Sequence, residues 1–387
     1  MSSEQIVIVG GGPAAMATAE SYREHGGKSV ITILTEERHL PYQRPPLTKE
    51  YLRGEGGREE LLLQEEGWYR RNRIDVHTET VIARIDPDAG TAFADDGRSW
   101  RFDRCVLATG CRPAVPGIPG LNRPEVQAMR RVEDSERLAA AADEGGAIVV
   151  IGSGFIGCEA AASLAMRGAR VTIAAAEERP QAERLDPDSG RRLSGWLEDL
   201  GVTVVSGSPL AEIAEEAGRT VARLETGRHL AADHVLLAMG IQRNCELATE
   251  AGLEMTDDVV CADSRMRSSN ESVLVVGDLA MAHNEAAGRT LRVEHWGEAL
   301  NHGKVAGSTL AGGDATWAVA PGFWSTIGRK TLKQAAWGDG HDTVSFEAHA
   351  DGAFTAWYEK EGSLVGVLTH ECDDDYDEGR RILEEGM

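Results

Sequence analysis

The chain has 387 residues, enough for two or three domains, and its 42% hydrophobic and 5% aromatic content is that of a globular protein. Its 40 Lys and Arg against 63 Asp and Glu give a net charge of −23, which disfavours nucleic acid and anionic membranes as bulk partners. No apolar run approaches the roughly 18 residues of a membrane span, and residues 1–5 carry no basic start before an apolar core. We therefore expect a cytoplasmic protein, a monomer or homodimer.

The cysteines are scattered along the chain, without C-x-x-C or any other metal-ligand spacing. Such a distribution is typical of reduced thiols in a reducing compartment, so no metal centre is expected. The six are Cys105, Cys111, Cys158, Cys245, Cys261 and Cys372.

A phosphate-binding turn follows the first apolar run, residues 6–9, where residues 10–15 read G-x-G-x-x-A. Gly10 permits a tight turn, Gly12 lets the backbone approach a pyrophosphate, and Ala15 lets a helix pack on the strand. The free amides of that helix, which Pro13 suits as a first-turn residue, favour an anion. The pattern predicts a dinucleotide cradle, and a second strand at 30–34 ends near Glu36, placed to meet a ribose hydroxyl.

A proline-bearing loop occupies residues 37–53 and is too constrained to be a flexible linker. It is either a surface loop stiffened by its prolines or a loop that holds Arg44 and Lys49 against a bound anion or ring. After a helix near 66–72, residues 74–101 alternate short strands with turn signals and predict an antiparallel meander.

The order then repeats. A buried strand at 105–107 ends in Ala-Thr-Gly at 108–110, and a new strand at 147–151 runs into the full G-x-G-x-x-G of residues 152–157. A helix, further strands and a second meander follow, and the series closes on Gly240. One glycine motif is weak evidence, but two at the head of the same series indicate an internal duplication of a dinucleotide-binding unit.

Beyond residue 240 the chain returns to the first unit, because a buried strand at 273–276 ends at Gly277 and Asp278, a carboxylate suited to a ribityl or ribose hydroxyl. From residue 321 three strand-like runs, at 343–347, 353–359 and 364–368, and an acidic helix from about 376 to 384 predict a small antiparallel sheet with a helix. The predicted fold is α/β, with two Rossmann-like domains and a small C-terminal α+β domain. The expected boundaries are 1–112 with 241–318 for the first dinucleotide-binding domain, 113–240 for the second, and 319–387 for the C-terminal domain.

These motifs resemble the FAD-dependent ferredoxin and rubredoxin reductases, a family of two-dinucleotide-domain flavoproteins, over nearly the whole chain. The most specific parts are the proline loop and the Glu-His-Trp triplet at 294–296. The resemblance implies Lys49, Glu159 and Trp296 as catalytic residues, with Glu159 holding Lys49 beside the flavin and Trp324 facing an electron acceptor. The predicted cofactor-binding residues are Gly10, Gly12, Pro13, Ala14, Ala15, Glu36, Arg44, Lys49, Thr109, Gly110, Gly152, Gly154, Phe155, Ile156, Gly157, Glu159, Glu177, Gly240, Asp278, Glu294, His295, Trp296 and Trp324.

Plainer interpretations stay open for several of these residues. Glu159 is otherwise a capping or surface carboxylate, and Trp296 and Trp324 are otherwise core aromatics. Disulfide reductases of this superfamily carry a redox cysteine pair early in the chain, where this sequence has none, so Cys111 and Cys158 are expected to be packing residues. Residues 366–375 also depart from the family pattern.

The resemblance implies an NAD(P)H-dependent flavoenzyme that passes electrons to a small iron-sulfur protein. The alternatives are an oxidase or diaphorase with oxygen, a quinone or a small molecule as acceptor, and a redox-responsive binding factor. In NADH-using members the second unit's strand ends in a carboxylate, but here Ala175 stands at that position. Either Glu177 reaches back, or the site is weak, or Arg179 takes the 2′-phosphate of NADPH. We expect NADH, because two adjacent carboxylates repel a phosphate.

Overall fold

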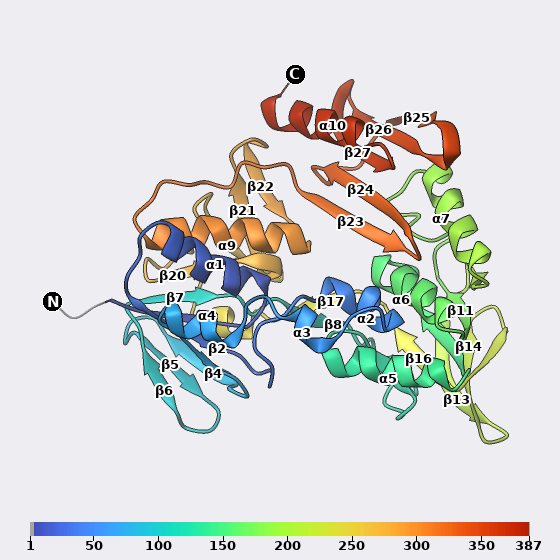
Figure 1. The fold of residues 1–387 in the computed structure, drawn as a ribbon, viewed down its shortest axis with the longest axis horizontal. Helices are drawn as coiled ribbons and strands as arrows, with labels where there is room; N and C mark the ends of the chain where they lie inside the picture. Colours follow the sequence, from blue (N-terminus) through green and yellow to red (C-terminus); the bar gives the residue numbers. More distant parts are fainter. Residues whose placement is uncertain (1–3, 387) are drawn as a thin grey trace.

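Residues 4–386 are described by the computed structural model, which is built around three five-stranded sheets (Figure 1). The first sheet has the order β20-β7-β1-β2-β3, and all its neighbouring strands are parallel. Its central strands are continuous apolar runs, as expected of strands covered on both faces. The strands are β1 (Gln5–Val9), β2 (Val30–Leu34), β3 (Ile74–His77), β7 (Arg104–Leu107) and β20 (Val273–Val275).

Two helices pack tightly together in this first unit, α1 (Pro13–Glu24) and α9 (Trp296–Leu310). A Cβ on Gly303 would lie 2.5 Å from the Ala14 carbonyl oxygen, and one on Gly307 would lie 2.4 Å from that of Thr18. The small residues of α9 therefore allow the two backbones to approach, and they bring the start of α9 to the same end of the sheet as the first glycine turn.

The predicted meander over 74–101 is only partly correct. Residues 74–77 form β3, which pairs in parallel with β2, whereas β4 (Ile82–Asp86), β5 (Thr91–Ala94) and β6 (Ser99–Arg101) form the antiparallel sheet. The apolar Ile74, buried beside α4 (Glu66–Arg71), favours the core sheet for this segment. Alternation over four residues does not distinguish an edge strand of a parallel sheet from a hairpin strand.

The second unit repeats this design with the order β12-β11-β10-β16-β9. β10, the strand that leads into the second glycine turn, lies at the centre of this sheet, as β1 does in the first sheet. The antiparallel sheet β13-β14-β15 corresponds to β4-β5-β6. Its elements are β9 (Val126–Ala128), α5 (Val132–Asp143), β10 (Ala147–Ile151), α6 (Phe155–Met166), β11 (Arg170–Ala174), α7 (Pro187–Asp199), β12 (Thr203–Val205), β13 (Leu210–Glu216), β14 (Arg219–Leu224), β15 (His229–Ala232) and β16 (His234–Leu237).

The chain crosses between the two units twice, in adjacent strands. β8 (Cys111–Pro113) carries it out and β17 (Ile241–Arg243) carries it back, and the two pair antiparallel. We keep the predicted boundaries at 112/113 and 240/241 as a proposal. The returning chain forms α8 (Glu246–Glu250), β18 (Met255–Thr256), β19 (Val259–Ala262), β21 (Ala280–Asn284) and β22 (Arg289–Arg292) before α9.

The third sheet is antiparallel, with the order β23-β24-β27-β26-β25, and α10 (Asp373–Glu385) packs against it. The three predicted strand runs are present, but the hairpin β23–β24 was not predicted and α10 begins earlier than expected. The strands are β23 (Gly322–Ile327), β24 (Lys330–Ala336), β25 (Thr343–Ala348), β26 (Phe354–Lys360) and β27 (Ser363–His370). Within residues 4–386 no helix is both long and apolar enough to cross a bilayer.

Candidate active site

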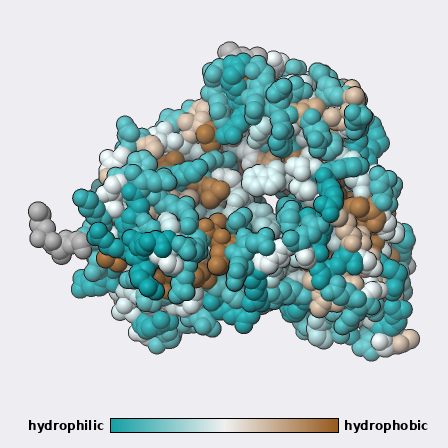
Figure 2. Space-filling view, in the orientation of Figure 1, coloured by the Kyte–Doolittle hydropathy of each residue, from teal (hydrophilic) through white to brown (hydrophobic). Residues whose placement is uncertain are grey.

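A cavity of about 960 Å³ is lined by residues of all three sheet-bearing units. On the face shown in Figure 2 most residues are hydrophilic, and the surface is hollowed near the middle of the molecule. Of the predicted site residues, Ala15, Gly152, Gly154, Gly157, Glu177 and Gly240 do not line the cavity. The predicted residues that line it are Gly10, Gly12, Pro13, Ala14, Glu36, Arg44, Lys49, Thr109, Gly110, Phe155, Ile156, Glu159, Asp278, Glu294, His295, Trp296 and Trp324.

The first glycine turn has the geometry of a pyrophosphate cradle. Gly10 has φ +119°, and a Cβ there would lie 2.1 Å from the Ala108 carbonyl oxygen, so a side chain cannot be accommodated. Gly12 is the residue before α1, and a Cβ on it would meet nothing within 4 Å, so its backbone is open on the cavity side. The α1 amides and this open backbone fit the diphosphate of a dinucleotide.

Two adjacent carboxylates after β2 have different partners. Glu36 is largely exposed at the cavity rim and forms an ion pair with Arg131. Glu37 turns inward and accepts hydrogen bonds from the Tyr42 hydroxyl and the Arg44 guanidinium. Burial raises the pKa of Glu37, but the charge of Arg44 and these hydrogen bonds outweigh it and hold the pKa below its ordinary value. Glu37 therefore positions Arg44, a role that its place after the strand does not predict.

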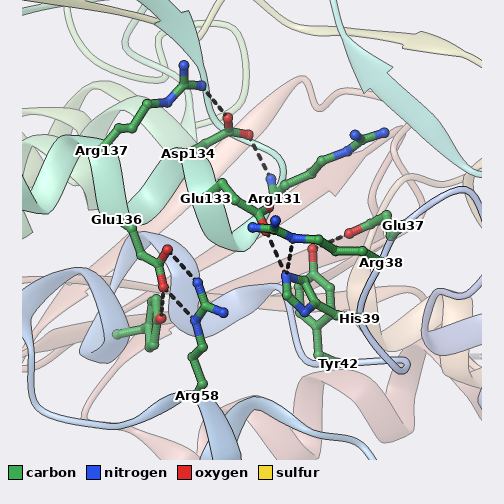
Figure 3. A network of polar contacts seen from close by, with 11 residues as sticks. Glu37, Arg38, His39, Tyr42, Arg58, Arg131, Glu133, Asp134, Glu136 and Arg137 are labelled. Carbon is green, nitrogen blue, oxygen red and sulfur yellow. Dashed lines mark hydrogen bonds and ion pairs between the residues drawn. The ribbon is translucent and has the colours of Figure 1, made fainter. Parts of the chain in front are cut away.

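The proline loop is fastened to α5 of the second unit by ion pairs (Figure 3). Arg38 and His39 of the loop contact Glu133. Glu136 accepts a hydrogen bond from the Tyr51 hydroxyl of the loop and pairs with Arg58 just beyond it. Most of these side chains are partly exposed, so each pair contributes little alone. As a set, with contacts spaced along the loop, they fix where it lies against α5.

At the inner end of this loop, Lys49 and Glu159 form a buried ion pair. Lys49 Nζ lies 2.6 Å from Glu159 Oε2, which also accepts a hydrogen bond of 2.6 Å from the Thr48 hydroxyl. The Ser325 hydroxyl on β23 donates to the other carboxylate oxygen at 2.7 Å. Both oxygens of Glu159 are thus occupied, and this arrangement joins the proline loop, α6 and the third sheet at one point.

Asp278 lies just beyond β20, where the Cys111 thiol donates to its Oδ2 at 3.0 Å. Burial, reinforced by the charge of Asp278, raises the pKa of Cys111 to about 12, so the thiol remains protonated. Arg130 also lines the cavity, and burial together with the charge of Arg44 lowers its pKa. Two partly buried guanidiniums whose positive charges oppose each other favour a bound anion nearby. The sequence offered no signal for Arg130, which lies in a loop after β9.

The Glu-His-Trp triplet lies at the start of α9, and each of its three side chains has different neighbours. Glu294 lines the cavity but is paired with the buried Arg243. His295 Nδ1 is buried without a hydrogen-bond partner among the described residues, and burial lowers the pKa of this imidazole to about 4. Its ring contacts Phe323, which in turn contacts Phe155 at 4.4 Å between centroids. Trp296 begins α9, and Trp324 on β23 is 47% exposed.

The second glycine turn matches the first. Gly152 has φ +104°, a Cβ there would lie 2.2 Å from the Ala238 carbonyl oxygen, and a Cβ on Gly154 would meet nothing within 4 Å. Ala175 is buried, and Glu177 reaches back so that its Oε2 accepts a hydrogen bond of 2.8 Å from the Ser153 hydroxyl of the turn. A carboxylate therefore does lie beside the second cradle, two residues later in the chain than the usual position.

Known proteins share this arrangement. The family profile of pyridine nucleotide-disulphide oxidoreductases matches residues 4–303, and the chain belongs to this family. It is 33% identical to rubredoxin-NAD(+) reductase of Pseudomonas putida over 329 residues, 85% of each chain. It is 31% identical to rhodocoxin reductase of Rhodococcus erythropolis over 99% of this chain and 90% of that one.

Among solved structures, the covalent putidaredoxin reductase–putidaredoxin complex matches with a TM-score of 0.94 at 27% identity, over 99% of this chain and 93% of that chain. The predicted fold class and the resemblance to the ferredoxin and rubredoxin reductases are confirmed. The chain is an oxidoreductase that uses FAD and NAD(P)H. The roles of the individual site residues are proposals.

Proposed function

We propose that the chain takes hydride from NADH and delivers electrons to a small iron-sulfur protein of the ferredoxin or rubredoxin type. One observation carries this proposal: a single cavity extends from the first glycine turn past the Lys49–Glu159 pair to the start of α6 and the exposed Trp324. The relatives support the acceptor class, since their names specify rubredoxin and rhodocoxin, and the matched complex contains putidaredoxin.

The chain's residues would bind and orient the cofactors. The open backbone at Gly12, with Arg44 and Arg130, would hold the FAD diphosphate, Glu36 the ribose and Asp278 the ribityl chain. Bound FAD would supply the chemistry that links two-electron hydride transfer from the donor to one-electron transfer to the acceptor.

The Lys49–Glu159 pair would provide the electrostatics of the reaction. Glu159 holds the Lys49 ammonium in a buried position on the cavity wall, where its positive charge stabilises developing negative charge more strongly than it would in water. Phe155, Ile156 and Trp296 line the same region and would exclude water from the reacting rings. We propose Lys49, Glu159 and Trp296 as the catalytic residues.

The cysteines of the chain argue against thiol chemistry in this cavity. Cys111 lines it, but its thiol is buried, donates to Asp278 and has a pKa raised by burial to about 12. A protonated thiol is a poor nucleophile. We accordingly favour direct electron transfer over a disulfide or persulfide substrate. All six cysteines are free, which supports a cytoplasmic location as a further proposal.

The donor preference rests on Glu177. Its carboxylate beside the Ser153 hydroxyl is suited to accept a hydrogen bond from a ribose 2′-hydroxyl and would repel a 2′-phosphate. We propose NADH as the preferred donor.

Anaerobic reduction with each nucleotide, followed by an acceptor assay, tests this function. The purified protein should be yellow, release FAD on heating, and be bleached faster by NADH than by NADPH. NADH consumption should then depend on added ferredoxin or rubredoxin. Release of FMN, or the absence of flavin from a folded, FAD-supplemented sample, would contradict the cofactor assignment. Reduction that NADPH drives tenfold faster would contradict the donor assignment.

A further inference from the structure

The third sheet carries a group of side chains that the proposed reductase site does not use. His349 follows β25, Cys372 immediately precedes α10, and Asp375 lies in the first turn of α10. His349 is distant in sequence from Cys372 and Asp375, yet one donor atom of each of the three residues lies within 4.8 Å of the other two. Two of the three fall in the run of residues 366–375 that departs from the family pattern.

A buried hydroxyl orients two members of this group. Thr355 on β26 is fully buried and donates a hydrogen bond to the Asp375 carboxylate, and its oxygen lies 3.5 Å from His349 Nε2. His349 Nε2 is 3.7 Å from Asp375 Oδ2. Outer hydrogen-bond partners that orient imidazole and carboxylate ligands are typical of metal sites.

Cys372 is not explained by local helix chemistry. It occupies the position before α10 where Ser, Thr, Asp or Asn normally caps the helix, but its side chain makes no capping hydrogen bond to the described residues. Its thiol is free and partly exposed, so it is neither a core residue nor half of a disulfide.

The first turn of α10 makes both apolar and polar contacts with the third sheet. Within the described part of α10 the buried residues are Gly379, at its middle, and Leu383, and Tyr376 of the first turn packs partly buried against the same apolar cluster as Leu383. The polar contacts of this turn include Lys333 Nζ to Asp373 at 2.6 Å. A bond from this turn to the β25–β26 edge would add to these contacts at the start of the helix.

We propose that His349, Cys372 and Asp375 bind a divalent transition-metal ion of the Zn²⁺ type, which ties the start of α10 to the end of β25. Imidazole, thiolate and carboxylate are the ligands that Zn²⁺ takes, and the thiolate disfavours Mg²⁺ and Ca²⁺. Water or a neighbouring carboxylate would complete the tetrahedron, because Glu371, Asp373 and Asp374 line the same concavity. Their charge offsets the positive end of the helix dipole.

Zn²⁺ bonds of about 2.0–2.3 Å place tetrahedral ligand atoms roughly 3.3–3.8 Å apart. The 3.7 Å separation of the His349 and Asp375 atoms already meets that requirement. The 4.8 Å limit on the whole group means that Cys372 has to move by about an ångström at most. A rotation of this partly exposed side chain supplies such a shift.

Alkylation of cysteine in the metal-free flavoprotein tests the site directly. The protein is treated with iodoacetamide with and without one equivalent of Zn²⁺, and modification is followed at each cysteine by peptide mass spectrometry. Zn²⁺ should slow modification of Cys372 at least tenfold, because coordination removes the nucleophilic thiolate. Cys261, the other partly exposed cysteine, is the internal control and should be unaffected, and Mg²⁺ should protect neither.

Variants then assign the ligands. His349→Ala and Asp375→Asn should each abolish the protection of Cys372, whereas His341→Ala, which changes an exposed histidine of the same domain outside the group, should retain it. The proposal is overturned if Zn²⁺ leaves the alkylation rate of Cys372 unchanged. Protection that persists in both His349→Ala and Asp375→Asn would also overturn it.

Discussion

Lys49 is a buried cationic residue that Glu159 holds in place. Its ammonium lies 2.6 Å from the Glu159 carboxylate, and both side chains are buried. Lys49→Ala should retain FAD but slow reduction of the flavin by NADH by about ten- to a thousandfold, at about 1.4 kcal/mol per decade. Stopped-flow absorbance of the flavin measures this step.

The matched control for this variant is Lys28→Ala, which removes an exposed lysine outside the cavity. NADH should reduce the flavin of this control at the native rate. If NADH also reduced the flavin of Lys49→Ala at the native rate, the Lys49–Glu159 ion pair would have only a structural role. Loss of flavin from the variant would assign Lys49 to binding.

We expect Glu177 to determine the preference for NADH over NADPH. Glu177→Gln should lower kcat/KM for NADH by roughly tenfold, or about 1.4 kcal/mol, and narrow the preference over NADPH, because the charged acceptor for the ribose hydroxyl is lost. The adjacent, exposed Glu178 provides the control, since Glu178→Gln should change neither value. If Glu177→Gln and Glu178→Gln changed kcat/KM equally in a dye-linked assay, Glu177 would not be the residue that binds the ribose hydroxyl.

The sequence predicts a site residue when a local turn requires it, and does not predict one that reaches the site only through the packing of separate elements. Gly10 and Gly12 are required by a local turn, so spacing alone predicts them. Glu37 and Ser325 act through other side chains, Arg44 and Glu159, and their partners become adjacent only when separate elements pack. Arg130 likewise carries no motif, because its position in the cavity depends on how the loop after β9 is folded back.

Helix α9 contains a buried acid that should make stability depend on pH. Glu298 accepts hydrogen bonds from Trp317 Nε1 and Asn301 Nδ2, and burial raises its pKa from 4.5 to about 7. In the unfolded chain the carboxyl loses its proton near the lower value, whereas in the folded protein it keeps the proton to the higher one. The free energy of unfolding should therefore fall as pH rises from about 4.5 to 7.

Glu298→Gln removes this titration while keeping the shape of the side chain. At pH 8 the variant should be more stable than the native protein by about 2–3 kcal/mol, and at pH 4.5 the two should be similar, in urea unfolding followed by tryptophan fluorescence. Glu285→Gln, outside the α9 core, is the control. A difference between native and Glu298→Gln that is the same at both pH values would exclude the proposed titration.

Elements with a strong periodic signal were predicted, and those that depend on their neighbours were not. The two glycine-headed strands and the strand after residue 272 are continuous apolar runs, which length and burial identify. The hairpin β23–β24 is a mixture of polar and apolar residues that pairs with β27, so its strand character comes from the sheet it joins. The predicted start of α10 was late because its acidic first turn, favourable to a helix N-terminus, resembles a loop by composition.

The whole molecule carries a charge of −23, which bears on its encounter with an acceptor. Each basic side chain of the hairpin that bears Trp324 is paired with an acid: Arg329 with Glu55, Lys330 with Asp199, and Lys333 with Asp373. The face around Trp324 thus has little excess positive charge to attract an acidic ferredoxin.

We expect kcat/KM for an acidic ferredoxin to stay within about threefold, or to rise, between 10 and 150 mM ionic strength, because added salt screens the overall repulsion. Steady-state NADH oxidation at a series of salt concentrations gives this dependence. A fall of tenfold or more over that range would show that a basic docking patch exists elsewhere on the surface.

Electrons should pass from NADH, through the flavin bound in the cavity, to an iron-sulfur protein. Single-turnover stopped flow measures this transfer: the protein is reduced anaerobically with one equivalent of NADH and then mixed with oxidised ferredoxin, oxidised rubredoxin or oxygen. We expect one of the iron-sulfur proteins to reoxidise the flavin at least tenfold faster than oxygen does at equal concentration, and Trp324→Ala to slow that reaction. Reoxidation by oxygen that outpaces both iron-sulfur proteins would instead identify an oxidase.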